Sequence, residues 1–256
     1  MNDGNNRVLV LADDFTGAND AGVSLAEAGM SVEVAFTAGQ PSTARALILN
    51  SDSRAMTAAA AADKVAALLR GAATFVPHWQ VKKIDSTLRG NPGGELEAMM
   101  AAQGCRMAVV APAYPAAGRH TRDGRCYVHG VPLDQTEFAS DPKTPVSRAE
   151  ISEIIAMQSR LPCLTLNAGQ LPAALATAGE EKRVLIVDAW EDSHLDQGID
   201  AVAPHARETL LVGSAGAGSP PAPQRAGPAA GGGRFDERDG AAPGCCAAGP
   251  FPSTGD

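Results

Sequence analysis

The sequence lacks the features that mark membrane, secreted and nucleic-acid-binding proteins. It has no stretch of about 18 apolar residues that could span a membrane, and the apolar run at residues 8–12 is too short for a signal peptide. A net charge of −8 without any basic run argues against a nucleic-acid partner. The 5 cysteines are odd in number and irregularly spaced, so they form neither a disulfide framework nor a zinc motif. We therefore expect a cytoplasmic protein with reduced thiols.

Several motifs of phosphate and metal chemistry are also missing. The sequence contains no Gly-x-x-x-x-Gly-Lys-[Ser/Thr] loop, and residues 213–218 do not follow the pattern Gly-x-Gly-x-x-Gly. A haloacid-dehalogenase-type phosphatase needs an aspartate two positions before Asp14, where this chain has Ala12. The 5 histidines form no His-Glu-x-x-His pair, and we interpret them as surface or structural residues.

What the sequence does contain is a regular alternation of strand and helix patterns. Apolar runs predict strands at 7–12, 31–36, 46–50, 81–84, 107–111, 183–188 and 209–213, and apolar stripes predict helices near 18–26, 58–69, 92–100 and 151–155. This rhythm predicts an α/β fold with a mostly parallel sheet and helices on both faces. Residues 119–148 show little periodicity, with short strand candidates near 127–128 and 131–133. We interpret this long irregular segment as functional.

The last 40 residues differ in composition from the rest of the chain. Residues 217–256 contain 9 Gly, 7 Pro and 9 Ala and no Leu, Ile, Val or Met, so they cannot bury enough apolar surface to offset the entropy of ordering. One interpretation is that the reading frame is lost near Ala217. The other is a genuine low-complexity tail. Sequencing the gene distinguishes them, because frame loss requires α/β-patterned sequence in another downstream frame.

The stretch 82–91, Lys-Lys-Ile-Asp-Ser-Thr-Leu-Arg-Gly-Asn, is the centre of the functional prediction. It connects a short strand to a helix for which Asn91 is the expected N-cap, Pro92 the first residue and Glu95 a favourable charge in the first turn. Its polar residues therefore lie where a strand ends and a helix begins. In open α/β sheets, ligands bind at that edge.

Three further polar turns follow predicted strands, at 13–17, 51–54 and 116–119. Because the carboxyl ends of parallel strands face one edge, the four turns should converge and supply carboxylates, hydroxyls and arginines. Arginine grips a carboxylate or phosphate, and aspartate accepts from a hydroxyl, so this inventory suits a small polyhydroxy acid. Each turn alone has a simpler explanation: Asp13 and Asp14, like Ser86 and Thr87, could be helix caps, and Arg54 could form a surface ion pair.

The polar motifs closely resemble those of the four-carbon acid sugar kinases. The resemblance extends from about residue 7 to 216 in the family's order and spacing, and it is carried by residues 12–20, 52–54, 82–91, 115–119, 129–133, 136–139 and 141–142. Such kinases phosphorylate threonate, erythronate or 3-oxo-tetronates with ATP and Mg²⁺. The resemblance implies an acid-sugar site lined by Asp13, Asp14, Arg54, Asp85, Ser86, Thr87, Arg89, Asn91, Gly118 and Arg119.

The resemblance also implies roles for some of these residues. Asp14 or Asp85 would orient or deprotonate the attacking hydroxyl, and Arg89, with Arg54 or Arg119, would hold the substrate carboxylate. Residues 212–216 resemble the loop that opens the family's nucleotide domain, which makes Ser214 a candidate nucleotide contact.

The chain departs from the family after this loop, because the glycine-rich segments that hold ATP phosphates have no counterpart. We expect residues 1–209 to form the acid-sugar domain, 210–216 to begin a largely missing C-terminal nucleotide domain, and 217–256 to be a tail. Such a truncated kinase would bind no ATP or Mg²⁺ tightly, would transfer phosphate poorly or not at all, and could form a homodimer. The alternatives are a non-catalytic acid-binding or regulatory module, and a defective remnant with exposed apolar surface.

Overall fold

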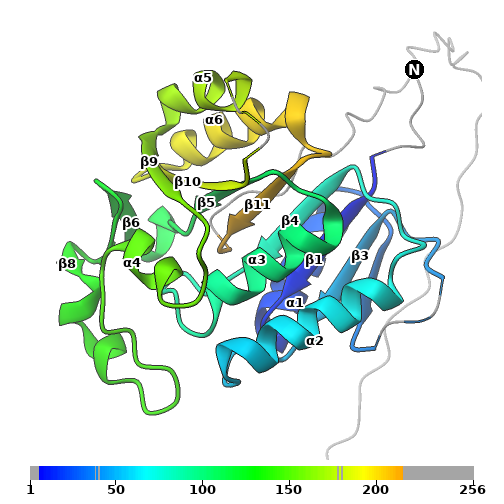
Figure 1. Cartoon of the computed structure of the whole chain (residues 1–256), viewed down its shortest axis with the longest axis horizontal. Helices are drawn as coiled ribbons and strands as arrows, with labels where there is room; N and C mark the ends of the chain where they lie inside the picture. The colour runs from blue at the N-terminus through cyan, green and yellow to red at the C-terminus, as the bar shows by residue number, and fades with distance from the viewer. Residues whose placement is uncertain (1–5, 38, 40, 178, 180, 216–256) are drawn as a thin grey trace, which may run out of the picture. The chain divides into compact units, whose positions relative to one another are not determined.

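The computed structural model describes residues 6–37, 39, 41–177, 179 and 181–215 of the chain (Figure 1). In this part of the chain, 8 parallel strands form a sheet in the order β2-β3-β1-β4-β11-β5-β10-β9. The strands are β1 (Val8–Ala12), β2 (Val32–Ala35), β3 (Ala46–Asn50), β4 (Trp79–Lys83), β5 (Met107–Ala111), β9 (Cys163–Asn167), β10 (Arg183–Asp188) and β11 (Thr209–Gly213). The predicted tail, residues 217–256, lies outside the described residues.

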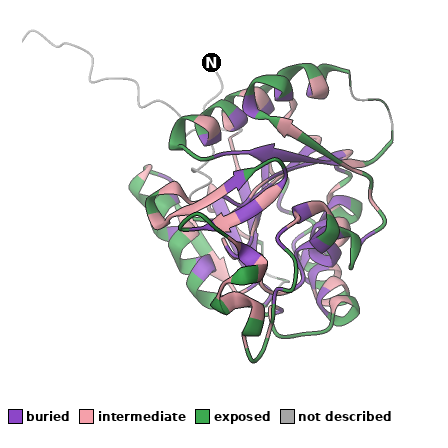
Figure 2. Cartoon of the chain, turned by 90° about the vertical axis from the view of Figure 1, so that its left-hand side faces the viewer, coloured by how far each residue is buried: buried purple, intermediate pink, exposed green. Residues whose placement is uncertain are grey.

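Helices cover both faces of the sheet, as predicted (Figure 1). Alternate residues of each buried strand point to opposite faces, so Leu9 and Leu11 join one core cluster and Val8 and Val10 the other. In Figure 2 the buried residues are concentrated on the strands and on the inner sides of the helices. The helices in the first cluster are α2 (Ala58–Gly71), α3 (Pro92–Gln103) and α4 (Ile151–Ala156), and those in the second are α1 (Phe15–Glu27), α5 (Leu171–Ala176) and α6 (Asp192–Val202).

The connections place a topological switch point between β1 and β4. From β1 the chain moves to β2 and β3 on one side, and it then returns to β4 on the other side of β1. The helix that follows β1, α1, and the helix that follows β4, α3, belong to different core clusters and so lie on opposite faces. At such a switch point, the usual ligand site of an open α/β sheet is the crevice between the ends of the two strands.

The irregular segment 119–148 contains a second, antiparallel sheet. It is formed by β6 (Arg119–Arg122), β7 (Arg125–Val128) and β8 (Val131–Pro132), so the two predicted short strands are present and have a third partner, β6, which was not predicted. Single turns of 3₁₀ helix complete the described elements: η2 (Pro115–Ala117), η3 (Leu133–Gln135), η4 (Glu137–Ser140), η5 (Ala168–Gln170) and η6 (Ala203–His205).

Two parts of the sheet differ from the sequence-based expectation. We expected a second domain to begin at residue 210, but β11 pairs with β4 on one side and β5 on the other, so residues 209–213 lie in the interior of this sheet. Strand β9 was not predicted, because it is an edge strand whose residues are mostly exposed or half-buried. Among the described residues, no helix is long and apolar enough to cross a membrane.

Candidate functional site

Arg54 connects the turn after β3 to the turn after β1. Its Nε and Nη2 donate to the two oxygens of Asp13 at 2.8 and 2.9 Å, and its Nη1 donates to Asp14 Oδ2 at 2.7 Å. Burial disfavours the charge on Arg54, but the hydrogen bond to Asp13 and the charges of Asp13, Asp85 and Asp14 raise its pKa. All three nitrogens of this guanidinium therefore already face aspartates.

Asp14 has a structural and a potential chemical role at once. Its Oδ1 accepts from the backbone N–H of Gly17 at 2.9 Å, so the carboxylate caps α1. Helix capping is the simpler explanation that the sequence offers for Asp14. Its other oxygen binds Arg54, and the side chain remains 24% exposed, compared with 4% for Asp13. Of the two aspartates after β1, Asp14 is the one that a ligand can reach.

Asp85, after β4, is held almost as tightly by Arg89. The two side chains form a bidentate pair at 2.9 and 3.0 Å, and Thr87 donates to Asp85 Oδ2 from its hydroxyl and, at 3.2 Å, from its backbone N–H. Burial acts to raise the pKa of Asp85, but the hydrogen bonds from Arg89 and Thr87 and the charges of Arg89 and Arg54 outweigh it and lower the pKa to about 2. Arg89 also reaches Asp141 at 3.4 Å.

Asn91 does not cap α3 with its side chain. Its Nδ2 donates to the backbone carbonyls of Ser53 and Met56 at 3.1 and 2.9 Å, and this amide ties the β3 turn to the start of α3. Ser53 in turn donates to Glu95 Oε1 at 2.8 Å. Asn91 is a buried link between two turns, and it also lines a cavity of about 200 Å³ together with Arg54 and Gly90.

Gly118 and Arg119 lie where η2 leads into β6. Gly118 has φ +69°, and a Cβ atom there would come within 2.3 Å of His129 Nδ1, so both the backbone and the space require glycine. Arg119 is half-buried, and its Nη1 donates to the Ala117 carbonyl. Its Nε is buried and finds no acceptor among the described residues. Arg119 is therefore held by backbone but not by a carboxylate.

Ser86 and Ser214 complete the predicted set. Ser86 is half-buried, and its side chain makes no hydrogen bond to the described part of the chain, while its carbonyl accepts a weak contact from Cys126 Sγ at 3.7 Å. Ser214 follows β11 and is buried, and its hydroxyl donates to the Ala113 carbonyl at 3.1 Å.

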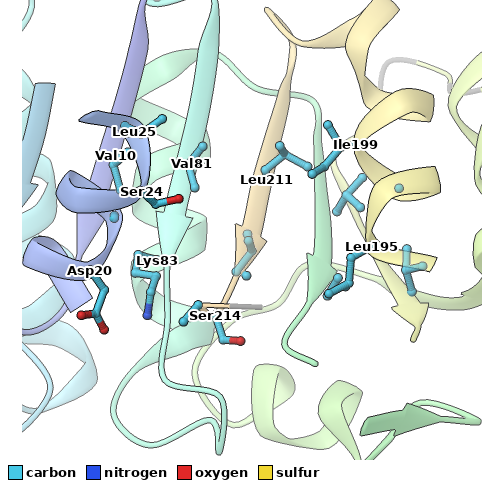
Figure 3. A pocket seen from close by; sticks show the side chains of 18 of the residues that line it. Val10, Asp20, Ser24, Leu25, Val81, Lys83, Leu195, Ile199, Leu211 and Ser214 are labelled. Atoms are coloured by element: carbon cyan, nitrogen blue, oxygen red, sulfur yellow. The ribbon is translucent and has the colours of Figure 1, made fainter. Parts of the chain in front are cut away.

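An apolar cavity of about 100 Å³ opens on the α1–α6 side of the sheet (Figure 3). Val81 of β4 and Leu211 of β11 lie along it, while Lys83 and Ser214 lie at the carboxyl ends of these two strands. Lys83 was not among the predicted site residues. Its position at the last residue of β4, two residues before Asp85, is a signal that sequence reasoning could have used, because strand alternation sends Lys82 and Lys83 to opposite faces.

Comparisons of the sequence and of the structure with known proteins both find relatives of this chain. Residues 8–220 match the family described as the sugar-binding N-terminal domain. A D-threonate kinase of Salmonella typhimurium is 46% identical over 219 residues, covering 82% of this chain and 52% of that protein. A D-erythronate kinase of Heliobacterium modesticaldum is 36% identical over 203 residues, covering 74% of this chain and 46% of that protein. The chain spans about half the length of these curated relatives.

Among solved structures, a domain of unknown function from Bordetella bronchiseptica superposes with a TM-score of 0.75 and 31% identity. The alignment covers 86% of this chain and 57% of that one, which was solved with bound citrate as a domain-swapped dimer.

Proposed function

The chain belongs to the four-carbon acid sugar kinase family, of which it carries the sugar-binding N-terminal domain, and we propose that its β1–β4 crevice binds a four-carbon acid sugar. The observation that carries the proposal is the convergence of Asp14, Asp85 and their arginine partners at the topological switch point of the sheet. Threonate, erythronate and 3-oxo-tetronate, the acids in the relatives' names, are the candidate ligands.

Arg119 is the proposed partner of the ligand carboxylate. Arg54 and Arg89 already bind aspartates through Nε and both terminal nitrogens, so either would have to break an ion pair to grip the acid. Arg119 has no carboxylate within ion-pair distance in the described part of the chain, and its Nε has no acceptor there. A charge-assisted hydrogen bond to the ligand would satisfy it.

Asp14 is the proposed partner of a ligand hydroxyl. Asp85 is a weak proton acceptor because its pKa is about 2 and both its oxygens are occupied by Arg89 and Thr87. Asp14 is more exposed than Asp13 and adjoins the crevice. Asp85, with Arg89, then fixes the shape of the turn, and Ser86 offers its free hydroxyl to the ligand.

Kinase activity also needs a site for ATP and Mg²⁺. The hydroxyl of Ser214, the candidate nucleotide contact, donates to the Ala113 carbonyl. We infer that the relatives' second halves contribute most of the site for ATP and Mg²⁺. The dimeric Bordetella neighbour with bound citrate also makes a homodimer that accepts small carboxylic acids a reasonable proposal.

A non-catalytic acid-binding module is the second candidate. It is favoured by the hydroxyl of Ser214, the candidate nucleotide contact, which donates to the Ala113 carbonyl. The two candidates share the acid site and differ in whether any phosphorylated acid forms with Mg-ATP.

A thermal-shift screen of D-threonate, D-erythronate and 3-oxo-tetronates, with and without Mg-ATP, tests the proposal. We expect one acid to raise the Tm, with no further effect of Mg-ATP. Arg119→Gln should abolish the shift, whereas Arg122→Gln, on the same strand but 77% exposed, should preserve it. If no acid raises the Tm of the unaltered chain, the site assignment is wrong. If the acid is phosphorylated, this chain is itself a kinase.

A further inference from the structure

The amino end of α3 is capped by a residue from a distant part of the chain. A helix leaves its first amides without intrahelical acceptors, and the residue just before it usually supplies one. Here the side-chain amide of Asn91 is turned towards the β3 turn instead. Gln158, two residues beyond the end of α4, takes its place: its Oε1 accepts from the backbone N–H groups of Gly93 and Gly94 at 2.9 and 3.3 Å.

The same side chain also holds the turn that precedes α3. Its Nε2 donates to the Gly90 carbonyl at 3.1 Å, and the backbone N–H of Gln158 is itself fixed by the Ile155 carbonyl at 3.0 Å. One amide group therefore connects the end of α4 both to the start of α3 and to the end of the stretch 84–91. It uses different atoms for the two contacts, Oε1 for the cap and Nε2 for the turn.

Close backbone packing fixes the place from which Gln158 reaches the turn. A Cβ atom at Gly93 would come within 2.6 Å of the Ile155 carbonyl oxygen and 3.1 Å of Gln158 Cβ. Gly93 is buried, and its missing side chain lets α4 end directly against α3.

Gly90 connects this contact to the acid site. Gly90 has φ +91°, and a Cβ atom there would come within 3.1 Å of Arg54 Cγ and 3.3 Å of the Arg54 carbonyl oxygen. Gly90 also follows Arg89, whose guanidinium holds Asp85. A shift of Gly90 would therefore displace both arginines that hold the carboxylates of the crevice.

We propose that Gln158 is a positioning residue of the acid site, which acts through its hydrogen bond to the Gly90 carbonyl. This role rests on the proposed function, since it concerns acid binding in the β1–β4 crevice. The side-chain hydrogen bonds of Gln158 within the described chain all go to backbone groups, so it acts through the turn. The simpler alternative is a cap that stabilises α3 without affecting the acid. A cap needs only Oε1, whereas positioning needs Nε2.

Gln158→Glu separates the two roles. Its carboxylate still accepts from Gly93 and Gly94, at a helix end that favours negative charge, but it cannot donate to the Gly90 carbonyl. We expect the urea midpoint of unfolding to change little. The affinity for D-threonate, measured by calorimetric titration of the full chain, should fall roughly tenfold. Gln158→Met, which removes both kinds of hydrogen bond at a similar side-chain length, should lower the midpoint and the affinity together.

Two controls address the added charge. Gln170→Glu introduces the same charge at another capping glutamine, whose Oε1 accepts from the Asn167 N–H at 3.0 Å at the end of the edge strand β9, and it should leave the affinity unchanged. Charges are screened over about 3 Å in about 1 M salt, compared with about 10 Å in about 0.1 M. The loss in Gln158→Glu should therefore be the same in both. A loss that disappears at the higher salt concentration is repulsion of the acid, and the proposal is then wrong.

Hydrogen exchange gives a readout that needs no ligand. In the turn, the backbone N–H of Leu88 donates to the Asp85 carbonyl at 3.0 Å, and that of Thr87 donates to the Asp85 carboxylate at 3.2 Å. We expect these two amides to exchange roughly tenfold faster in Gln158→Glu, while the amides in the second half of α3 keep their rates.

The outcomes separate this role from the proposed function. If D-threonate or D-erythronate binds and Gln158→Glu binds it equally well, the positioning role is wrong and the acid site stands. If the exchange rates of the turn do not change, the positioning role is wrong whether or not an acid binds. If the rates change but neither acid binds to the unaltered chain, the proposed function fails, and Gln158 holds the turn without serving an acid.

Discussion

Individual ion pairs shape the turns of this site before any ligand binds. Arg54 holds Asp13 and Asp14, and Arg89 holds Asp85, each at 2.7–3.0 Å. Such half-buried pairs fix the direction of short side chains that would otherwise repel one another. Outside these pairs, Arg119 has no carboxylate partner among the described residues, and within them Asp14 stays partly exposed.

The paired state of Asp85 predicts an acid-sensitive component of stability. The folded-state pKa of about 2 lies below the model-peptide value of 3.8, so the stabilisation is fully present above about pH 4 and is lost as the pH falls towards 2. This shift corresponds to about 2 kcal/mol of unfolding free energy. Urea denaturation at a series of pH values should show it as the difference between the unaltered chain and Asp85→Asn.

A matched control for this acid sensitivity is Asp123→Asn. Asp123 is 89% exposed and pairs only distantly with Arg122, so its removal should leave the pH profile as it was. If the unfolding free energy of the unaltered chain and that of Asp85→Asn fall equally as the pH is lowered towards 2, the assignment is contradicted.

The space taken by His129 predicts an unusually costly substitution at Gly118. Gly118→Ala combines a positive φ with a Cβ position already filled by the imidazole, whereas Gly104→Ala has nearly the same φ, +71°, and nothing within 4 Å. We expect Gly104→Ala to lose about 1 kcal/mol of unfolding free energy and Gly118→Ala clearly more, with weakened acid binding through Arg119. Adding His129→Ala should recover the difference; if it recovers none, steric conflict with the imidazole is not the cause.

At the scale of elements, β4 and α3 are joined by a buried charge network. Lys82 on β4 and Glu95 in the first turn of α3 pair with 0% and 1% of their side chains exposed, and Ser53 from the β3 turn donates to the same glutamate. This network fixes the start of α3 relative to β4. It thereby sets the path of residues 84–91 between them.

Removing one partner of this network should be severe. Glu95→Gln leaves the buried Lys82 ammonium without its counter-charge, and we expect a loss of about 3–5 kcal/mol in unfolding free energy. Glu153→Gln is the control, because the Arg148–Glu153 pair is 58% and 52% exposed and contributes about 0–1 kcal/mol. Both values come from urea titrations. A loss at Glu95 as small as that at Glu153 would show that the buried pair does not anchor α3.

At the scale of the whole described unit, the small antiparallel sheet shares a core with the large one. Cys126 of β7 and Cys105, between α3 and β5, belong to the same hydrophobic cluster. Cys105 contacts Gln80 of β4 and Cys126 contacts the Ser86 carbonyl, so both thiols are tied to the centre of the large sheet. The two sheets should therefore unfold together.

Thiol reactivity tests this cooperation. Burial raises the pKa of both Cys105 and Cys126 to about 12, and the folded thiols should not react with Ellman's reagent near pH 8. In a variant with serine at positions 163, 245 and 246, both should react at one common rate, that of global unfolding. Restoring the half-buried Cys163 is the positive control. Faster reaction of Cys126 alone would mean that the small sheet opens independently.

The sequence by itself determined the fold class and the sheet edge at which the polar turns meet. Continuous apolar runs such as residues 8–12 and 183–188 are typical of the interior strands of a parallel sheet. Parallel pairing then brings the polar turns 13–17, 51–54 and 84–91 to one edge. These inferences depend on periodicity along the chain. Edge strand β9 escaped them because it is not buried enough to show such a pattern.

Only the tertiary structure decided which charges are paired and where β11 lies. An arginine cannot be assigned to a ligand from its position in the chain, because Arg54 meets carboxylates about 40 residues away that become neighbours only when β1 and β3 pair. Likewise, β11 lies between β4 and β5 because long-range strand pairing, not chain order, sets its place. The physical reason is the same in both cases: ion pairing and sheet order depend on distances in space, which local sequence does not encode.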